Sequence, residues 1–159
     1  MHDNNYVHLD IKPENITIYG NDDINQCESK LIDFGVAKNI DGLSNMNSIY
    51  SVGTEHYMAP ELNSETKLEL KSIDYTKCDI YSLGNAIVHG TNLNDETIVK
   101  QMTPLIDMVD NDPLKRPNIQ FIINELSKII DNLSSANNTS TTISVKDRIS
   151  FFENYGNVE

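Results

Sequence analysis

The clearest hydrophobic pattern of the chain lies between residues 119 and 133. Apolar residues recur there at steps of three and four over successive turns, the spacing that places side chains on one face of an α-helix. Asn118 directly precedes the pattern, and its side chain is suited to cap the first free N–H groups. We therefore predict a helix that follows Asn118 and packs its apolar face into a core. The recurring positions are Ile119, Ile122, Ile123, Leu126, Ile129, Ile130 and Leu133.

Two earlier segments have patterns that also favour helices. Residues 77–89 offer few polar positions on any side, which is typical of a buried helix, and Thr76 is suited to cap it. Thr103 and Pro104 make a good start for a further helix, with the threonine as cap and the proline in the first turn. Asp112 and the proline after it are expected to end that helix. Together these segments predict a mainly α fold.

A β-hairpin is predicted nearer the N-terminus. Residues 16–19 alternate between apolar and polar side chains, the period-two pattern of a half-buried strand. Residues 20–23 have the composition of a turn, and residues 30–33 form a second short strand. A hairpin of these two strands would place Asp10 and Asp33 near each other at one end.

The remaining stretches are polar or isolated. Residues 39–51 are expected to form a surface loop, and residues 134–143 form a linker of small polar side chains. In the last segment, 144–159, three apolar residues fall on one helical face. Such a segment could dock on a partner groove, pack back on the domain or fray. The three residues are Val145, Ile149 and Phe152.

Length and charge restrict the class of protein. The 159 residues suffice for one domain, and the net charge of -12 argues against nucleic acid and anionic membrane surfaces as partners. The two cysteines, Cys27 and Cys78, belong to no zinc-binding pattern. No stretch approaches the ~18 apolar residues of a membrane span, and the N-terminus lacks the apolar region of a signal peptide. We therefore expect an intracellular, cytoplasmic protein with reduced cysteines.

Candidate chemistry gathers first in residues 8–15, which read His-Leu-Asp-Ile-Lys-Pro-Glu-Asn. Asp10 can accept a proton from a hydroxyl group, and Lys12 can neutralise a phosphoryl group. Asn15 can hold a divalent cation through its amide oxygen, because hard cations prefer oxygen ligands. The proline in the run opposes a regular helix there. The run is therefore a candidate site carried by a non-helical loop.

Three further motifs follow along the chain. In the triplet Asp33-Phe34-Gly35, the aspartate follows a strand and can hold a metal that bridges two phosphates, while Gly35 permits backbone angles that larger residues resist. Residues 53–61 read Gly-Thr-Glu-His-Tyr-Met-Ala-Pro-Glu, and residues 79–84 read Asp-Ile-Tyr-Ser-Leu-Gly. Taken alone, the aspartate at 79 could simply be an acid in the first turn of its helix, where acids are favourable.

In order and spacing, the four motifs resemble the C-terminal lobe of protein kinases. The run at 8–15 resembles the catalytic loop, and residues 53–61 resemble the end of the activation segment. Residues 79–84 look like the start of the central buried helix of that lobe. The resemblance covers roughly residues 6–133. It implies a truncated kinase-like helical lobe with a short β-hairpin that carries the catalytic loop and the Asp-Phe-Gly triplet.

The resemblance implies an activity and roles for three residues. A family member transfers the γ-phosphoryl group of ATP to a protein hydroxyl group. Asp10 would orient or deprotonate that hydroxyl, and Lys12 would stabilise the group in transfer. Thr54 would position the substrate side. Lys12 and Thr54 resemble the serine/threonine branch of the family more than the tyrosine branch.

The resemblance also implies ATP and Mg²⁺ as cofactors. Asn15 and Asp33 would ligate magnesium, and Thr17 occupies the position from which the family offers a floor to adenine. Glu61 would pair with a distant arginine, and the aspartate at 79 would bond the backbone of the catalytic loop. Residues expected to have structural roles are His8, Phe34, Gly35, Glu61, Asp79 and Arg116.

The sequence departs from the family pattern in two respects. No glycine-rich loop and no strand lysine precede His8, so we expect the N-terminal lobe to be absent and this chain alone to be inactive. Leu9 stands where many members have an arginine that receives a phosphate, which disfavours switching by phosphorylation at Ser48, Tyr50 or Ser51. The alternative function is a pseudokinase-like module that binds a protein partner without catalysis. The sequence does not indicate an oligomeric state.

Overall fold

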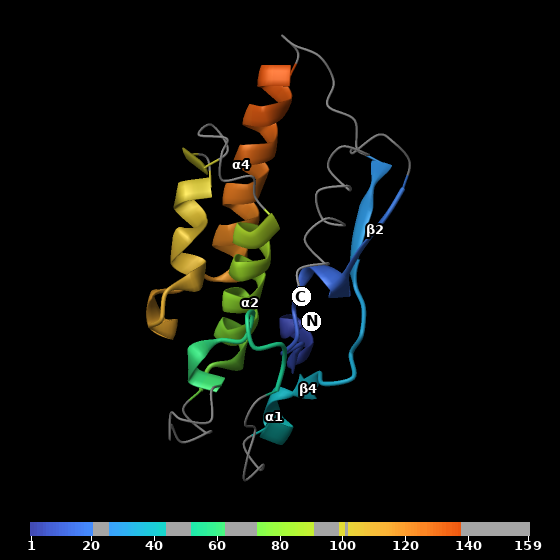
Figure 1. Ribbon diagram of the computed structural model, residues 1–159, viewed down its shortest axis with the longest axis vertical. Coiled ribbons are helices and arrows are strands. Elements are labelled where there is room, and N and C mark those ends of the chain that lie inside the picture. Colours follow the sequence, from blue (N-terminus) through green and yellow to red (C-terminus); the bar gives the residue numbers. More distant parts are fainter. Residues whose placement is uncertain (21–25, 44–51, 63–72, 91–98, 101, 138–159) are drawn as a thin grey trace.

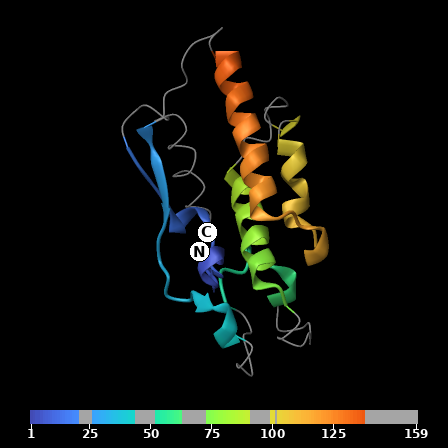
Figure 2. The same ribbon diagram turned by 180° about the vertical axis from the view of Figure 1, so that it is seen from behind.

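Two helices, α2 (Tyr75–Gly90) and α4 (Ile119–Asn137), form the centre of the molecule, and an antiparallel hairpin lies to one side of them (Figure 1). The hairpin consists of β2 (Ile16–Tyr19) and β3 (Glu28–Leu31). The 3₁₀ helix η6 (Thr103–Val109) lies on the other side of the helices, and the same order is seen from behind (Figure 2). The protein is thus partly helical with small antiparallel sheets.

The computed structural model describes residues 1–20, 26–43, 52–62, 73–90, 99–100 and 102–137. Within these residues no helix is long and apolar enough to span a membrane. Shorter elements connect the main ones. They are η1 (His2–Asn4), β1 (Tyr6–Val7), η2 (Pro13–Asn15), β4 (Lys38–Asn39), α1 (Ile40–Leu43), η4 (Pro60–Leu62) and η7 (Pro113–Lys115).

The predicted hairpin forms, with Ile16 opposite Leu31 and Tyr19 opposite Glu28. Its second strand begins two residues earlier than expected, at Glu28, and ends at Leu31. The alternating pattern of residues 16–19 located the first strand, although burial does not follow it: Ile16 and Thr17 are half-buried, whereas Ile18 and Tyr19 are exposed. In the second strand, the polar side chains of residues 28–30 are exposed, so they gave no alternating signal. The predicted turn at 20–23 falls largely outside the described residues.

The expectation of a surface loop at 39–51 is wrong for its first part. Strand β4 pairs with β1 in an antiparallel register that places Tyr6 opposite Asn39. Helix α1 follows at once, and its Leu43 is almost fully buried. One apolar side chain packed into a core outweighs the polar composition around it, because burial of a leucine contributes about 1.5–3 kcal/mol. Residues 44–51 lie outside the described part of the chain.

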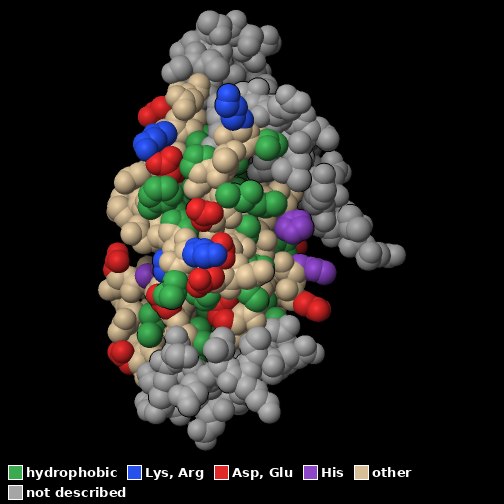
Figure 3. All heavy atoms as spheres, turned by 90° about the vertical axis from the view of Figure 1, so that its left-hand side faces the viewer, with side chains coloured by type: hydrophobic (Ala, Val, Ile, Leu, Met, Phe, Trp, Pro, Cys, Tyr) green, Lys and Arg blue, Asp and Glu red, His purple; other side chains and the backbone are tan. Residues whose placement is uncertain are grey.

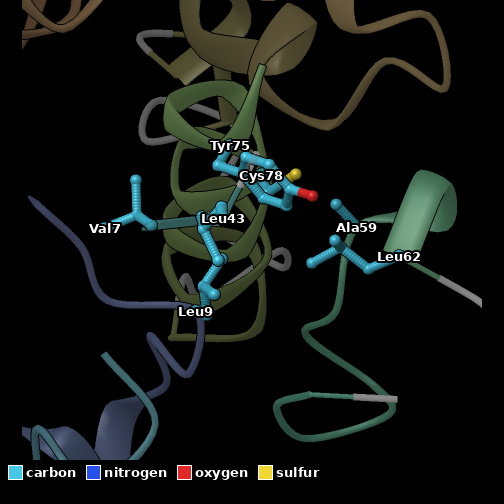
Figure 4. Packing of buried hydrophobic residues seen from close by; sticks show 7 residues of the cluster. All are labelled: Val7, Leu9, Leu43, Ala59, Leu62, Tyr75 and Cys78. Carbon is cyan, nitrogen blue, oxygen red and sulfur yellow. The ribbon is translucent and has the colours of Figure 1, made fainter. Parts of the chain in front are cut away.

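One core joins the N-terminal loop to the start of α2. Leu9 of the loop, Leu43 of α1 and residues of two later segments point into a common interior in Figure 4. The loop that holds the candidate chemistry is therefore packed against the central helix rather than suspended at the surface. The buried members of this core are Val7, Leu9, Leu43, Ala59, Leu62, Tyr75 and Cys78.

A second core lies where α2, η6 and α4 meet. Ile80 of α2 packs there with Met108 of η6 and Ile122 of α4. Helix α2 and η6 approach so closely at Gly84 that an added Cβ would lie 2.7 Å from Met108 Cβ. A glycine is needed at this point because real Cβ atoms essentially never come so near to another atom. The predicted buried helix is thus confirmed, although Val88 at its far end is exposed.

Helix starts were predicted with mixed success. Asn118 caps α4 as expected, since its Oδ1 accepts the Phe121 N–H at 2.8 Å. The predicted cap of α2 is wrong. Asp74 accepts the N–H of Thr76 at 3.1 Å and its hydroxyl at 2.6 Å, so the threonine lies inside the helix. Both residue types are good caps, and composition alone cannot decide which one lies next to the free N–H groups.

The prediction of a helix at residues 103–112 also needs correction. The segment forms the 3₁₀ helix η6, which ends at Val109, three residues before the expected stop. Thr103 is not its cap, because its hydroxyl donates to the Val99 carbonyl at 3.2 Å, one turn back. Asp112 begins the next short helix instead, where its carboxylate accepts the Leu114 N–H at 3.0 Å.

The apolar stripe of α4 is only partly a core face. Ile122 and Ile129 are buried, whereas Ile119, Ile123 and Ile130 are 41%, 48% and 59% exposed. The expectation that the whole stripe packs inside is therefore wrong within the described residues. The helix also continues to Asn137, across the first residues of the predicted linker 134–143. The rest of that linker and the segment 144–159 lie outside the described residues.

Candidate functional site

Three polar side chains surround the carboxylate of Asp10 and form one hydrogen-bonded network with it. Thr54 donates its hydroxyl hydrogen to Asp10 Oδ1 at 2.8 Å, and Asn15 Nδ2 donates to Asp10 Oδ2 at 3.0 Å. Lys12 Nζ lies 3.1 Å from Asp10 Oδ2 and donates to Thr54 Oγ1 at 2.8 Å. Residues separated by 44 positions in the sequence thus share one hydrogen-bonded cluster. The network joins four of the predicted site residues.

The network determines the charge of Asp10. Burial alone would raise the pKa of this carboxyl group, because it penalises the charged form. The hydrogen bonds from Thr54, Lys12 and Asn15, together with the positive charge of Lys12, outweigh burial and lower the pKa below its ordinary value. Asp10 is therefore ionised at neutral pH, as a proton acceptor must be.

Asn15 presents its amide in one orientation. It ends the short helix η2, which Pro13 starts, and its side chain is almost fully buried. The amide nitrogen donates both to the Asp10 carboxylate and to the Asp10 backbone carbonyl, the latter at 2.9 Å. This orientation leaves Oδ1 as the atom that can bind a cation.

Asp33 is brought close to Asn15 by the residue before it. The Ile32 N–H donates to the Asn15 carbonyl at 2.9 Å, and the Ile32 carbonyl contacts His8 Nε2 at 3.1 Å. Asp33 itself has a φ of 59°, in the left-handed region that non-glycine residues seldom adopt. Asn15 and Asp33, whose side chains both offer oxygen atoms, therefore lie at the same end of the hairpin, and their role as metal ligands stays a prediction.

These two donors fit a magnesium ion. Among the described residues, no three His, Cys, Asp or Glu side chains gather in a cluster that could hold a metal alone. Magnesium is commonly held by one or two protein oxygens, with water and phosphate oxygens completing its coordination. The Asn15 amide oxygen and the Asp33 carboxylate match that donor set.

The other two residues of the triplet lie beside Asp33 and His8. Gly35 permits unusual backbone angles, but the positive φ of this turn belongs to Asp33. The Gly35 N–H donates to Asp33 Oδ1 at 3.1 Å, so a close turn holds the carboxylate. Phe34 stacks beside His8 with ring centroids 5.2 Å apart, yet 54% of it is exposed.

Asp79 anchors the backbone of the loop. Its two carboxylate oxygens accept the N–H groups of His8 and Leu9, each at 2.8 Å. His2 Nε2 adds a third contact at 2.9 Å, a partner that sequence reasoning missed. Asp79 is 2% exposed and lies inside α2, so the simple reading of a solvated first-turn acid is wrong. The central helix and the loop are therefore joined by short, buried hydrogen bonds.

Leu9 is held in a strained conformation by that anchor. Its φ is 64°, and such a backbone costs of order 1–3 kcal/mol in a non-glycine residue. The hydrogen bond to Asp79 and the burial of the leucine side chain in the first core offset this cost. A leucine occupies a core position here, so this residue offers no charged group to a phosphate. Residues 48, 50 and 51, considered as phosphorylation sites, lie outside the described residues.

Gly53 positions Thr54, a role that sequence reasoning also missed. Its φ is 108°, and a Cβ at this position would lie 2.4 Å from the Leu9 carbonyl oxygen. Both the conformation and the contact require glycine. The segment that carries Thr54 can therefore approach the loop closely enough for its hydroxyl to reach Asp10. This role depends on the positive φ of Gly53 and on its contact with Leu9, and neither can be inferred from a single sequence.

Glu61 and Arg116 form the expected ion pair. Two parallel hydrogen bonds join them, from Nη1 to Oε1 at 2.6 Å and from Nη2 to Oε2 at 2.8 Å. Both side chains are buried, and Arg116 also donates to the carbonyls of Lys77 and Asp110. The pair ties the end of the segment that carries Thr54 to the start of α2 and to the loop before α4.

Cys78 lies against this ion pair. Its thiol donates to Glu61 Oε1 at 3.2 Å. Burial raises the pKa of the thiol strongly, and the negative charge of Glu61 raises it further. A neutral thiol of this kind is a hydrogen-bond donor and not a nucleophile.

Thr17 lies in β2 opposite Lys30. In the part of the chain that the structure describes, no hydrogen bond links it to the network around Asp10. Its predicted place beside adenine stays a prediction.

Acidic side chains are dispersed over the side of the molecule that carries η6, between hydrophobic and uncharged ones (Figure 3). The net charge of -12 therefore does not gather into one acidic patch on this face. This distribution gives no local reason to assign a cation or a basic partner to that side.

Comparison with known proteins gives a consistent result. The family profile of the protein kinase domain matches residues 1–142. A protein of Acanthamoeba polyphaga mimivirus named as a serine/threonine-protein kinase is 31% identical over 158 residues, covering 82% of this chain and 53% of the viral protein. The serine/threonine-protein kinase RUNKEL of Arabidopsis thaliana is 28% identical over 113 residues, covering 71% of this chain and 8% of the plant protein. The chain thus spans about half of the viral relative and a small part of the plant one.

Proposed function

The chain belongs to the protein kinase family, and from this premise we propose that it supplies the catalytic loop of a serine/threonine kinase domain. In a complete domain, that loop would serve the transfer of the ATP γ-phosphoryl group to a protein hydroxyl group. The observation that carries the proposal is the network in which Lys12, Asn15 and Thr54 converge on an ionised Asp10.

Asp10 is the proton acceptor in this proposal. Its carboxylate would accept a hydrogen bond from the substrate hydroxyl and align that oxygen for attack on the γ-phosphorus. It would take the proton as the new bond forms and the bond from phosphorus to the leaving ADP oxygen breaks. The lowered pKa keeps the carboxylate ready at neutral pH. Thr54 and Asn15 bond one carboxylate oxygen each, so they fix the plane of the group.

Lys12 supplies positive charge beside the acceptor. Its ammonium group contacts both Asp10 and Thr54, so it lies between the carboxylate and the segment that carries Thr54. A fixed cation there stabilises the negative charge of the phosphoryl group during transfer. Phosphoryl transfer depends on positioning and charge neutralisation, and Lys12 contributes to both.

Asn15 and Asp33 are the residues that would hold Mg²⁺ in this proposal. When bound, the ion neutralises charge on the phosphates of ATP. Thr17, which follows closely on β2, would face the adenine side of the nucleotide.

A phosphotransfer assay tests the proposal. The natural gene product that contains this chain is incubated with Mg-ATP and a basic protein substrate, and phosphate incorporation is measured. Asp10→Asn should reduce transfer by at least about 10²-fold, because a general base contributes that much. Glu28→Gln is the matched control, since this exposed carboxylate lies in β3 away from the network. Equal transfer by the wild type and by Asp10→Asn would refute the assignment.

A second candidate function is binding of a protein partner without catalysis. It is favoured by exposed apolar side chains beside the triplet, where Tyr6 and Phe34 are 47% and 54% exposed and line one pocket with Met1. Such patches mark sites of contact with other proteins. If this is the function, the wild-type protein transfers no phosphate, and Asp10→Asn binds the partner as well as the wild type does.

A further inference from the structure

The carboxylate of Asp79 receives one hydrogen bond from outside the candidate catalytic loop. Its Oδ1 accepts the Leu9 N–H, and its Oδ2 accepts the His8 N–H, each at 2.8 Å. His2 Nε2 lies 2.9 Å from the same Oδ2. An ionised carboxylate can only accept hydrogen bonds, so the hydrogen in this contact belongs to the imidazole. His2 is therefore a third donor to Asp79, and it comes from the short helix η1 instead of the loop.

This contact differs from an ordinary surface pair. The side chain of His2 is 21% exposed and that of Asp79 is 2% exposed. Exposed pairs contribute little because water screens them, whereas a buried carboxylate needs partners from the protein itself. The backbone of the turn after His2 is also held in place. The Asn5 N–H donates to the His2 carbonyl at 2.8 Å, and the Ile40 N–H donates to the Asn5 carbonyl at 2.8 Å. The fold thus holds His2 against α2.

His2 helps to fix the plane of the Asp79 carboxylate. The terminal torsion of an aspartate side chain has broad minima, so hydrogen bonds decide its plane. Two donors on Oδ2 and one on Oδ1 restrict the orientation in which all three bonds are kept. Without His2, only the two N–H groups of the loop would remain, and the carboxylate could turn together with them. His2 is the donor that ties Asp79 to a segment outside the loop.

The orientation of Asp79 matters because the residue that it holds is strained. Leu9 has a φ of 64° and directly precedes Asp10. A return of Leu9 to a negative φ would turn the backbone that carries Asp10. It would also move the Leu9 carbonyl oxygen, from which a Cβ added at Gly53 would be only 2.4 Å away. The next residue, Thr54, donates to Asp10 at 2.8 Å. The conformation of Leu9 therefore affects both Asp10 and the segment that reaches it.

We propose that His2 is a positioning residue of the candidate catalytic loop. Its Nε2–H fixes the Asp79 carboxylate, which keeps Leu9 in the left-handed conformation and thereby aims Asp10 at the acceptor hydroxyl. His2 acts through Asp79, because no side-chain hydrogen bond within the described residues joins it to the network around Asp10. The consequence for catalysis rests on the proposed function, whereas the effect on the loop does not.

Amide hydrogen exchange, measured by NMR in the natural gene product that contains this chain, tests the effect on the loop. His2→Phe keeps a ring without the donor, and His2→Gln keeps an N–H donor without the ring. The Leu9 amide should exchange roughly tenfold faster in His2→Phe, since the lost hydrogen bond goes to a charged group. His2→Gln should restore most of the protection. Asp3→Asn is the matched control, because Asp3 is exposed in the same short helix, and it should exchange like the wild type.

The amide of Ile129 separates positioning from general stability. Ile129 is buried in α4 and belongs to the second core. If His2→Phe speeds exchange at Leu9 and at Ile129 by the same factor, His2 only stabilises the whole fold, and the proposal is overturned. Unchanged exchange at Leu9 overturns it as well. If the phenylalanine variant does not fold, His2→Ala removes the donor with a smaller side chain and is judged by the same comparison.

Kinetics of phosphate transfer test the consequence for catalysis. A displaced Asp10 slows the chemical step and leaves nucleotide binding intact. His2→Phe should therefore lower kcat roughly tenfold while KM for ATP stays within about twofold, and His2→Gln should recover kcat. A raised KM at unchanged kcat would overturn the positioning role. If the wild type transfers no phosphate, the proposed function fails, and the exchange comparison still decides whether His2 positions the loop.

Discussion

Replacement of Glu61 by glutamine should destabilise the protein far more than loss of a surface carboxylate. Arg116 is 2% exposed, and Glu61 accepts two parallel hydrogen bonds from it at 2.6 and 2.8 Å. Glutamine has nearly the same shape, but it removes the negative charge and one acceptor. The guanidinium group would then stay buried with its charge uncompensated. The Cys78 thiol, which donates to Glu61 Oε1, would lose its anionic partner as well.

The expected loss of unfolding free energy is about 3–5 kcal/mol, the usual cost of removing one partner from a buried ion pair. The remaining contacts of Arg116 reduce this cost only in part, since the carbonyls of Lys77 and Asp110 carry no full charge. With a urea m-value of about 2 kcal/mol per M, the midpoint should fall by roughly 2 M. This is a large part of the ~5–15 kcal/mol that stabilises an ordinary domain.

Urea titrations followed by circular dichroism measure this shift. Glu28→Gln is the matched control, because Glu28 is 77% exposed, its partner Lys30 is 61% exposed, and such surface pairs contribute only ~0–1 kcal/mol. A double variant, Glu61→Leu with Arg116→Met, should recover much of the lost stability, since no unpaired charge is left. If Glu61→Gln and Glu28→Gln shift the midpoint equally, the buried ion pair does not stabilise the fold.

Three further predictions concern packing, capping and pH. Gly84→Ala should lower the unfolding free energy by about 1–3 kcal/mol in urea titrations, because the new Cβ would overlap Met108. An unchanged unfolding free energy would show that η6 can shift away from α2 without cost. Asn118→Ala should cost about 1 kcal/mol through loss of the N-cap of α4, and Asn118→Asp should restore it. Because the pKa of Asp10 is lowered by folding, its contribution is present above about pH 4, the unfolded value, and is lost as pH falls through the folded value. In urea titrations between pH 7 and pH 3, the unfolding free energy should therefore fall less steeply for Asp10→Asn than for the wild type.

The hydrophobic pattern sufficed to locate α2, α4 and the first strand of the hairpin. One side of α2 and of α4 is buried over several turns, and residues 16–19 of the first strand alternate between apolar and polar side chains, so the period of each element is visible in the sequence. The caps of α2 and η6 were predicted wrongly, because Asp74, Thr76 and Thr103 are all suitable types. Their roles depend on which side chain reaches a free N–H group, and that is decided by the backbone path.

The residues of the candidate site were predicted better than the residues that position them. Asp10, Lys12 and Asn15 were identified by the chemistry of their side chains, and Thr54 by the resemblance to the kinase family. Gly53 carries no group at all. Its role follows from a 2.4 Å approach between two segments that only the folded chain brings together. Positioning of this kind has no local signature, and therefore a single sequence does not reveal it.

The apolar stripe of α4 also shows what a single sequence cannot reveal. A period of three and four residues establishes that Ile119, Ile123 and Ile130 share a face with Ile122, but it cannot say how much of that face α2 and η6 cover. The two elements reach Ile122 and Ile129 and leave the other three residues exposed. The hydrophobic period therefore predicts which residues share a face, whereas the neighbouring elements decide which of those residues are buried.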